Sequence, residues 1–517
     1  MEIHDFMKKS NTVIGSAALV MIVSLSSKLL GFVRQMVIAS QFGSTVSTDI
    51  FFVSSEFMLG LSGALLASLT SALVTIYIDT AVKKNREEAN KIASKMLTIF
   101  LIASEAFIIL INLFAPYIAG MIAPAYSAED SAVLVKYLRF FSVVFIFTAF
   151  QSIYAAVLNA NDSFVPGKLY GIVYNPIAII FVLVFGSAIG TWSLVIAFIL
   201  GNIGQTLLLR AICGKVFRFR PSLELRDKAI KHLIILSLPL LAGNVFTQLN
   251  GIVDKAICSV LGEGIASNYS YAYTLEQFVT ATITISLSII LLSKYASYAA
   301  NGNTEMVIKT FKDSLGGLIL LLAPITIIAC VMSYEIVSVV YMRGQFDTEA
   351  AKYTSQALIG FCIGFIPVAI REMYVRLHFA YQDTKTPMLA NMGAVAINGG
   401  LSLILAKYMG IFGISLATSV SVLFSVAVLN KTAKKYIPEF RFLSIYKLLI
   451  KTAAAAVCAL CAALLVQRLG LNPLLKICLC VILSGGVYVL ALVILRCDEL
   501  KIFAEAAKNI VLEKFKR

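Results

Sequence analysis

The sequence predicts an all-α, polytopic membrane protein with 14 transmembrane helices, arranged as two parallel six-helix repeats and two C-terminal helices. Three observations carry this prediction: near-continuous apolar stretches, basic residues confined to alternate loops, and related segments about 220 residues apart. Of the 517 residues, 59% are hydrophobic and only 14% are charged. A stretch of about 20 apolar residues can cross the hydrocarbon as a helix, because its backbone hydrogen bonds are satisfied internally.

The apolar stretches are separated by polar loops, and each stretch is long enough to span a bilayer. The N-terminal segment "MEIHDFMKKSNTVIG" carries basic residues but no small-residue cleavage site, so we expect a retained first helix. The predicted spans are 11–33, 48–78, 93–123, 131–158, 165–187, 190–213, 229–262, 266–299, 308–341, 349–380, 387–407, 410–433, 445–468 and 473–496.

The net charge of +15 is concentrated in alternate loops. Basic residues precede the first span and recur in "VKKNREEANK", "GKVFRFRPSLELRDK" and "NKTAKKYIPEFRF", after the second, sixth and twelfth spans. The opposite loops, such as "PAYSAED" and "LGEGIAS", contain almost no Lys or Arg. This positive-inside pattern predicts that both termini are cytoplasmic. The positive charge is therefore a topology signal, and we expect no nucleic-acid partner.

Two pairs of segments indicate an internal duplication. The segment "LLGFVRQMVIASQFG" is similar to "LNGIVDKAICSVLGEG", which aligns Gly31 with Gly251 at a spacing of 220. Further along, "NDSFVPGKL" and "QDTKTPMLA" align Asp162 with Asp383 at a spacing of 221. This offset carries spans one to six onto spans seven to twelve. Because six is even, both copies enter the membrane in the same direction, as in transporters with parallel repeats.

The duplication divides the chain into four predicted parts. Residues 1–222 form an N-terminal lobe and residues 223–440 a C-terminal lobe. Residues 441–497 contain the last two spans, and residues 498–517 form a basic amphipathic helix. We expect this last helix to lie on the inner membrane surface, attracted by anionic lipids.

Charged side chains within the spans predict the functional site. A charge at bilayer depth is costly, so it faces protein or a water-filled cavity. We expect a cavity between the two lobes, with cations in the first span for an anionic substrate. The predicted substrate-contacting residues are Lys28, Arg34, Asp49, Glu56 and Glu276. The alternative is that Arg34–Asp254 and Lys28–Glu56 are structural ion pairs.

Two further groups of charged residues are candidates for other roles. Asp254 lies on a polar face of span seven, and Asp383 begins the turn after span ten, where it could also cap a helix. The end of span ten, "REMYVRLHFAYQD", places Arg371, Glu372 and Arg376 where they could form a gate or a head-group contact at the inner face.

Four segments together resemble the MurJ (MviN) family of lipid II flippases. They are "LLGFVRQMVIASQFG", "TDIFF", "VDKAICSVLGEGIASNYSYA" and "YQDTKTPM". This family belongs to the multidrug/oligosaccharidyl-lipid/polysaccharide (MOP) exporter superfamily, which includes the MATE transporters. The resemblance implies two six-helix lobes around a central cavity, with the last two spans forming a groove for a polyprenyl tail.

The same resemblance implies a transporter rather than an enzyme, in the bacterial cytoplasmic membrane. The expected cargo is an undecaprenyl-diphosphate-linked saccharide, moved from the inner to the outer leaflet by alternating access. An ion gradient or the membrane potential is the expected driving force. The expected partners are the lipid-linked saccharide, membrane lipids and cell-wall synthesis proteins, with the chain itself a monomer.

The resemblance also assigns roles to single residues. Arg34 occupies the position of the family's "GFxRD" arginine, and Asp49 that of the "TDAFF" aspartate. Asp254 matches an acid that helps to bind sodium in some members, and Asp383 matches the aspartate of "QDT+TP". Na+ at Asp254 and Asp383 is therefore the expected coupling ion, with H+ as the alternative.

The chain departs from the family pattern where other charged residues are expected. Gln35 replaces an acid, and Thr274 replaces the arginine expected in span eight. The arginine expected in span two falls at Ser62 or Gly63. Lys28 stands where the family has an arginine, and lysine lacks the bidentate grip of arginine on phosphate.

These departures leave other functions open. A cation-coupled drug antiporter of the same superfamily would use the buried acids, and a non-transporting cell-wall scaffold would not need the arginines. Another lipid-linked saccharide could replace lipid II as cargo. A membrane enzyme is disfavoured, because the outer loops are short and contain almost no catalytic groups.

Overall fold

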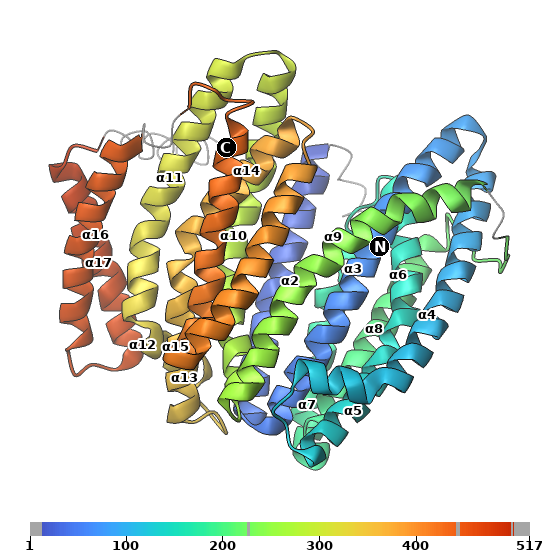
Figure 1. The fold of residues 1–517 in the computed structure, drawn as a ribbon, viewed down its shortest axis with the longest axis horizontal. Helices are drawn as coiled ribbons and strands as arrows, with labels where there is room; N and C mark the ends of the chain where they lie inside the picture. Colours follow the sequence, from blue (N-terminus) through green and yellow to red (C-terminus); the bar gives the residue numbers. More distant parts are fainter. Residues whose placement is uncertain (1–12, 225–227, 441–444, 498–499, 501–517) are drawn as a thin grey trace. The chain divides into compact units, whose positions relative to one another are not determined.

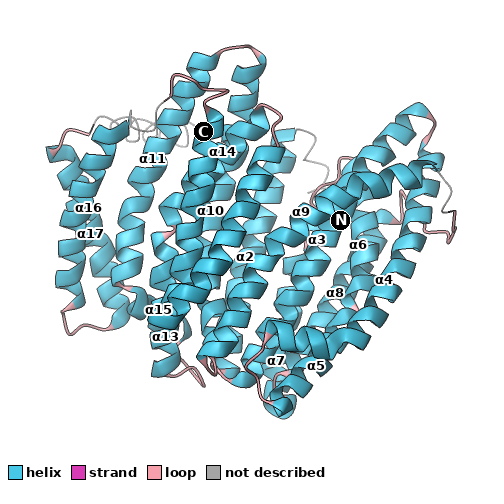
Figure 2. Cartoon of the chain, in the orientation of Figure 1, coloured by secondary structure: helices cyan, strands magenta, loops and turns pink. Residues whose placement is uncertain are grey.

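The computed structural model describes residues 13–224, 228–440, 445–497 and 500, and within these ranges all regular elements are helices (Figure 1, Figure 2). The predicted all-helical class is therefore confirmed. The amphipathic helix predicted at 498–517 lies outside the described residues, apart from Leu500.

The helices form two compact units, which divide inside one long helix. The first unit extends to Ser270 and includes Arg343–Asp347, and the second contains the remaining residues. The predicted border between the lobes lies at residue 222, whereas the compact units divide within α10 (Ile265–Ala300).

The first unit contains nine complete elements within the described residues. They are α2 (Val13–Phe42), α3 (Val46–Lys83), α4 (Arg86–Ile122), α5 (Ala128–Ser142), α6 (Val144–Ala160), the short 3-10 helix η1 (Pro166–Lys168), α7 (Tyr170–Ile189), α8 (Trp192–Cys213) and α9 (Lys228–Leu261). Helix α3 packs against α4, α5, α6 and α9, whereas α2 packs against α7. The central position of α3 explains why its first turns are buried.

The start of α3 is fixed by local chemistry. Thr45 precedes the helix, and its hydroxyl accepts a hydrogen bond from the Thr48 amide while the Thr48 hydroxyl accepts one from the Thr45 amide. This reciprocal capping box satisfies two amides that have no partner within the helix. It places Asp49 in the first turn, facing the interior of the unit.

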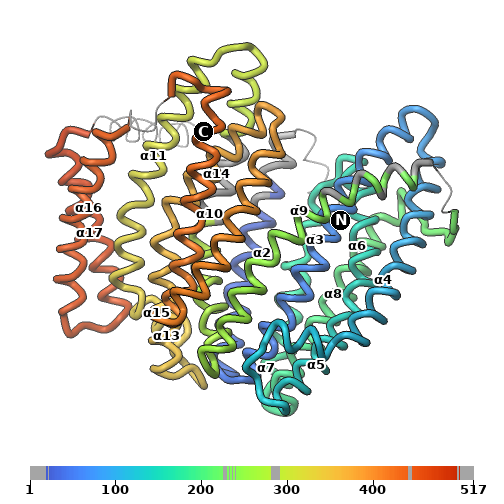
Figure 3. Tube along the Cα trace, in the orientation of Figure 1, coloured from blue at the N-terminus to red at the C-terminus, as the bar shows by residue number. Residues whose placement is uncertain are grey.

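The second unit contains the rest of α10 and seven further helices among the described residues. These are α11 (Thr304–Val331), α12 (Ser333–Tyr341), α13 (Thr348–Ile363), α14 (Phe365–Ala380), α15 (Lys385–Ala433), α16 (Tyr446–Gln467) and α17 (Pro473–Ile494). Helices α13 and α14 pack against α15. The hairpin of α16 and α17, red in Figure 3, packs on α11 and α12.

Polar contacts also fasten this hairpin. The Gln467 side-chain amide donates to the carbonyl of Val331 at 3.0 Å, and the Tyr488 hydroxyl donates to the carbonyl of Leu320 at 3.0 Å. Lys476 forms an ion pair with Glu335 at 3.6 Å. Glu335 of α12 therefore helps to hold the hairpin against α12.

The described residues contain ten helices long and apolar enough to cross a membrane. The pair α13 and α14, bent by 42°, forms an eleventh candidate if the pair is one span. Helix α15 runs for 49 residues but contains a break at Gly410, where φ is 57°. The break coincides with the border between the predicted spans 387–407 and 410–433.

Helix bounds recur at a spacing near 220 residues. Helix α5 begins at Ala128 and α13 at Thr348; Gly190 ends α7 with φ of 59°, and Gly410 breaks α15 with φ of 57°. The turns after α6 and α14 share one pattern, in which Asp162 and Gln382 both have φ near 60°. The sequence alignment of Asp162 with Asp383 is therefore wrong by one residue, because the backbone pairs Asp162 with Gln382.

Candidate functional site

Asp49 is fully buried in the first unit and caps the start of α10. Its carboxylate accepts hydrogen bonds from the amide of Gly264 at 2.7 Å, the amide of Ser267 at 2.6 Å and the Ser267 hydroxyl. A carboxylate is well suited to this position, because the first amides of a helix have no internal acceptor and carry partial positive charge. This geometry is that of a helix cap, and the substrate contact predicted for Asp49 remains untested.

Glu56, two turns further along α3, forms an ion pair with Lys255 of α9. Only 4% of Lys255 is exposed, and its ammonium lies 6.0 Å from the ring centroid of Phe52. The sequence had suggested Lys28 as the partner of Glu56. Lys255 was missed, although a lysine next to Asp254 in an apolar span was a usable signal.

Arg34 on α2 is a half-buried cation that forms no ion pair among the described residues. Its guanidinium lies 4.9 Å above the ring of Tyr174 on α7, and its Nε is buried without a hydrogen-bond partner. Arg34 therefore does not pair with Asp254, as the structural alternative required. A guanidinium with unused donors can bind an oxyanion. Lys28, on the same helix, is also half-buried.

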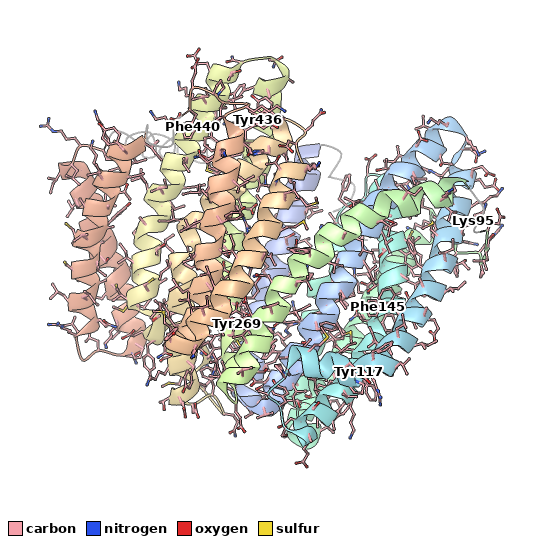
Figure 4. All side chains as sticks on the ribbon, in the orientation of Figure 1. Lys95, Tyr117, Phe145, Tyr269, Tyr436 and Phe440 are labelled. Atoms are coloured by element: carbon pink, nitrogen blue, oxygen red, sulfur yellow. The ribbon has the colours of Figure 1, made fainter. Side chains whose placement is uncertain are left out.

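Asp254 lies on α9 and is almost fully buried. Tyr269, labelled in Figure 4, donates its hydroxyl to Asp254 at 2.8 Å. Glu276 belongs to the second unit, where it is also buried and accepts a hydrogen bond from the Gln277 side chain at 2.9 Å.

Helix α14 of the second unit carries a compact charged group. Glu372 accepts from Arg371 at 2.7 Å and from Arg376 at 3.3 Å, so both predicted gate residues share one carboxylate. The three side chains are 19–27% exposed. Arg376 also lies over the ring of Phe379, and its Nε is buried without a partner.

Asp383 caps the start of α15. It accepts from the Thr386 amide at 3.0 Å and from the hydroxyl of Tyr436, labelled in Figure 4, at 3.1 Å. Burial raises the pKa of Asp383, but the hydrogen bonds from Thr386 and Tyr436 outweigh it, and the pKa falls below its usual range. Burial, followed by the contact with Asp383, raises the pKa of Tyr436 to about 12.

A sodium site fits this geometry only in part. Asp383 already accepts hydrogen bonds on both oxygens, as a helix cap does, so it fits an ion ligand poorly. Asp254 lies beside the hydroxyl oxygen of Tyr269, which could also coordinate an ion, so Asp254 is the better candidate for a sodium ligand. No group of three or more His, Cys, Asp or Glu side chains suited to a metal occurs in the described part of the chain.

Comparison with known proteins decides the family. The family model for "Lipid II flippase MurJ" matches residues 38–483. The chain belongs to the MurJ family. MurJ proteins are transporters, not enzymes, so this chain is a multi-span membrane transporter of the bacterial inner membrane.

Relatives match most of the chain at low identity. A probable lipid II flippase MurJ of Rickettsia prowazekii is 25% identical over 82% of this chain and 84% of its own length. One from Thermotoga maritima is 25% identical over 92% of this chain and 95% of its own length.

Solved structures show the same fold. A lipid II flippase MurJ in an inward closed conformation has a TM-score of 0.81 at 24% identity, covering 93% of this chain and all of the other. An inward-facing MATE family multidrug resistance transporter has a TM-score of 0.68 at 12% identity, covering 81% of this chain and 98% of the other. The chain therefore shares its fold with this MATE family transporter of the MOP superfamily.

Proposed function

We propose that this MurJ protein moves an undecaprenyl-diphosphate-linked saccharide, lipid II or a related cell-envelope precursor, from the inner to the outer leaflet by alternating access. The observation that carries the proposal is the family match over residues 38–483. A diphosphate bearing sugars cannot cross hydrocarbon unaided, whereas its lipid tail need never leave it. The cargo therefore requires a polar route for the head alone.

Arg34 is the residue best suited to contact the diphosphate in the first unit. Its half-buried guanidinium has no carboxylate partner among the described residues, and its Nε has no acceptor. A planar guanidinium can donate two parallel hydrogen bonds to phosphate oxygens, which a lysine cannot do. Lys28 would add a second positive charge, without the bidentate hydrogen bonds that an arginine can form to phosphate. Glu56 is already engaged with Lys255, so we assign it a supporting role.

A 14-span, two-repeat topology accompanies this proposal. Counting α15 as two spans at Gly410, the bent α13–α14 pair as one, and α9 and α10 as one each gives five spans. The nine other candidates, in which α5 and α6 together count as one span, bring the total to 14. The recurrence of helix bounds at a spacing of 220 supports two copies of one six-span unit. Basic residues in alternate loops support cytoplasmic termini.

Ion coupling would use Asp254. This acid is buried on α9 with a tyrosine hydroxyl beside it, and its charge would be balanced when Na+ or H+ binds. The α16–α17 hairpin, which is held on α11 and α12, would offer its apolar surface to the polyprenyl tail. Many of its large apolar side chains are exposed, as contact with lipid chains requires.

Translocation in reconstituted vesicles tests the proposal. Purified protein is reconstituted with a fluorescent lipid II, and the fraction reaching the opposite leaflet is measured by chemical quenching. We expect transfer by the wild type and loss of transfer in Arg34→Ala, with Arg210→Ala, an exposed arginine of α8, as the matched control. Wild-type vesicles that export a cationic drug but not the lipid would instead identify a drug antiporter. Vesicles inactive towards both would favour another lipid-linked saccharide as cargo or a non-transporting scaffold.

A further inference from the structure

The group formed by Arg371, Glu372 and Arg376 on α14 has features of a ligand site. Both guanidinium groups converge on one carboxylate, so the group keeps a net charge of +1. None of the three side chains makes another ion pair among the described residues. The Nε of Arg376 is buried and has no hydrogen-bond partner. The group thus retains positive charge and an unused donor.

The group cannot face lipid. At a rise of about 1.5 Å per residue, Arg371 lies about 14 Å before the end of α14 at Ala380, and Arg376 about 6 Å before it. Two guanidinium groups at such depths are costly in hydrocarbon. Their side chains are nevertheless 26% and 27% exposed. The exposed parts therefore require water or an anionic ligand.

The other half of the duplication shows that the fold does not need these charges. At the spacing of 220, the counterparts of Arg371, Glu372 and Arg376 on α6 are Gln151, Ser152 and Ala156. These three counterparts are neutral and buried. Helix α6 ends at the position equivalent to the end of α14 and begins one residue earlier, without charge at these positions, so packing alone does not explain two arginines on α14.

We propose that Arg371 and Arg376 bind the diphosphate of the lipid-linked cargo, and that Glu372 holds the two guanidinium groups together until the cargo displaces it. Two oxygens of a phosphate can accept the same paired hydrogen bonds from a guanidinium as a carboxylate does, and a diphosphate carries more negative charge. The assignment rests on the proposed function, since it names a binding site in the second unit for the proposed cargo. Of the two roles expected from the sequence, a gate or a head-group contact, it selects the head-group contact and assigns the competing role to Glu372.

Binding of undecaprenyl diphosphate to the purified full-length protein, measured by native mass spectrometry, tests the site. We expect Arg371→Gln and Arg376→Gln each to weaken binding by about ten- to a hundredfold, the effect of losing a charge-assisted hydrogen bond. Arg210→Gln, a matched change of an exposed arginine, should bind as the wild type does. Thermal unfolding of each variant reports whether it is folded.

Glu372→Gln separates a ligand site from a structural ion pair, because the two roles predict opposite results. If Glu372 competes with the diphosphate, the Gln variant binds the lipid several-fold more tightly. If the group only supports the fold, the variant is less stable and binds no better, and the proposal is overturned. Unchanged binding in both arginine variants would overturn it as well.

Phosphatidylglycerol distinguishes the cargo from ordinary anionic lipid. We expect it to bind at least about tenfold more weakly than undecaprenyl diphosphate, because it has one phosphate rather than two. Equal binding with the same dependence on Arg371 and Arg376 would overturn the cargo assignment and make the site a general headgroup site. That result would leave the proposed function intact, since transfer of lipid II in vesicles is measured separately.

Discussion

Replacing Asp49 with Ala should destabilise the first unit, because the helix cap at the start of α10 would be lost. Two buried amides, those of Gly264 and Ser267, would have no acceptor. The Ser267 hydroxyl would keep one hydrogen-bond partner, because the Thr48 hydroxyl lies 3.1 Å away. Each orphaned buried amide costs about 1–3 kcal/mol. N-cap replacements usually cost about 0.5–2 kcal/mol, since water relieves part of the loss. We therefore expect Asp49→Ala to lower the free energy of unfolding by about 2–4 kcal/mol.

Unfolding in mixed detergent micelles with increasing denaturant measures this change. Asp49→Asn keeps one side-chain oxygen acceptor, so it should lose about half as much stability. Asp79→Ala, on the same helix, removes only an exposed ion pair with Lys83 and should change stability by less than about 0.5 kcal/mol. A stable Asp49→Ala variant that no longer binds the lipid would refute the capping role and restore the substrate contact predicted from the sequence.

Three other substitutions test separate parts of the site. Arg34→Ala should reduce lipid transfer at least about tenfold with normal folding, because a phosphate donor is lost; full transfer in vesicles would exclude the role. Asp254→Asn should change the dependence of transfer on Na+ or on pH, and an unaltered ion dependence would remove Asp254 from coupling. Asp383 has a depressed pKa in the folded protein, so its stabilisation is present above its unfolded pKa of about 4 and is lost as pH falls through the folded value. Asp383→Asn should therefore be less stable than the wild type at pH 7 and nearly equal to it well below pH 4; an equal difference at both pH values would contradict this.

The helices could be predicted because hydrocarbon imposes a length and a composition on each span. The sequence placed a gap at 408–409, between two predicted spans, and the non-helical residue of α15 is the adjacent Gly410. The division of the units within α10 could not be found in this way, since it depends on which helices pack together. The sequence alignment also shifted the repeat by one position at Asp162. It matched Asp162 to Asp383 because both are aspartates, whereas the residue with the equivalent backbone conformation is Gln382.

The charged residues of the site could be predicted from the sequence, but the partners with which they interact could not. Asp49, Glu56 and Asp254 were identified because charge is rare in apolar spans. Their partners come from segments far away in the chain: Asp49 reaches Gly264, and Glu56 reaches Lys255. No periodicity or spacing within one helix contains that information. The ion pair of Glu372 with Arg376 is different, because side chains four residues apart on a helix can meet, and this local signal was available in "REMYVR".

The central claim is that this chain transports a lipid-linked cell-envelope precursor. Rescue of bacterial cells depleted of their own lipid II flippase tests it most directly, with growth and precursor accumulation as the readouts. We predict that the wild-type chain restores growth and clears the accumulated precursor, whereas Arg34→Ala, made at the same level, does neither. Expression of the wild type in the membrane without any clearance of the precursor would contradict lipid II as the cargo.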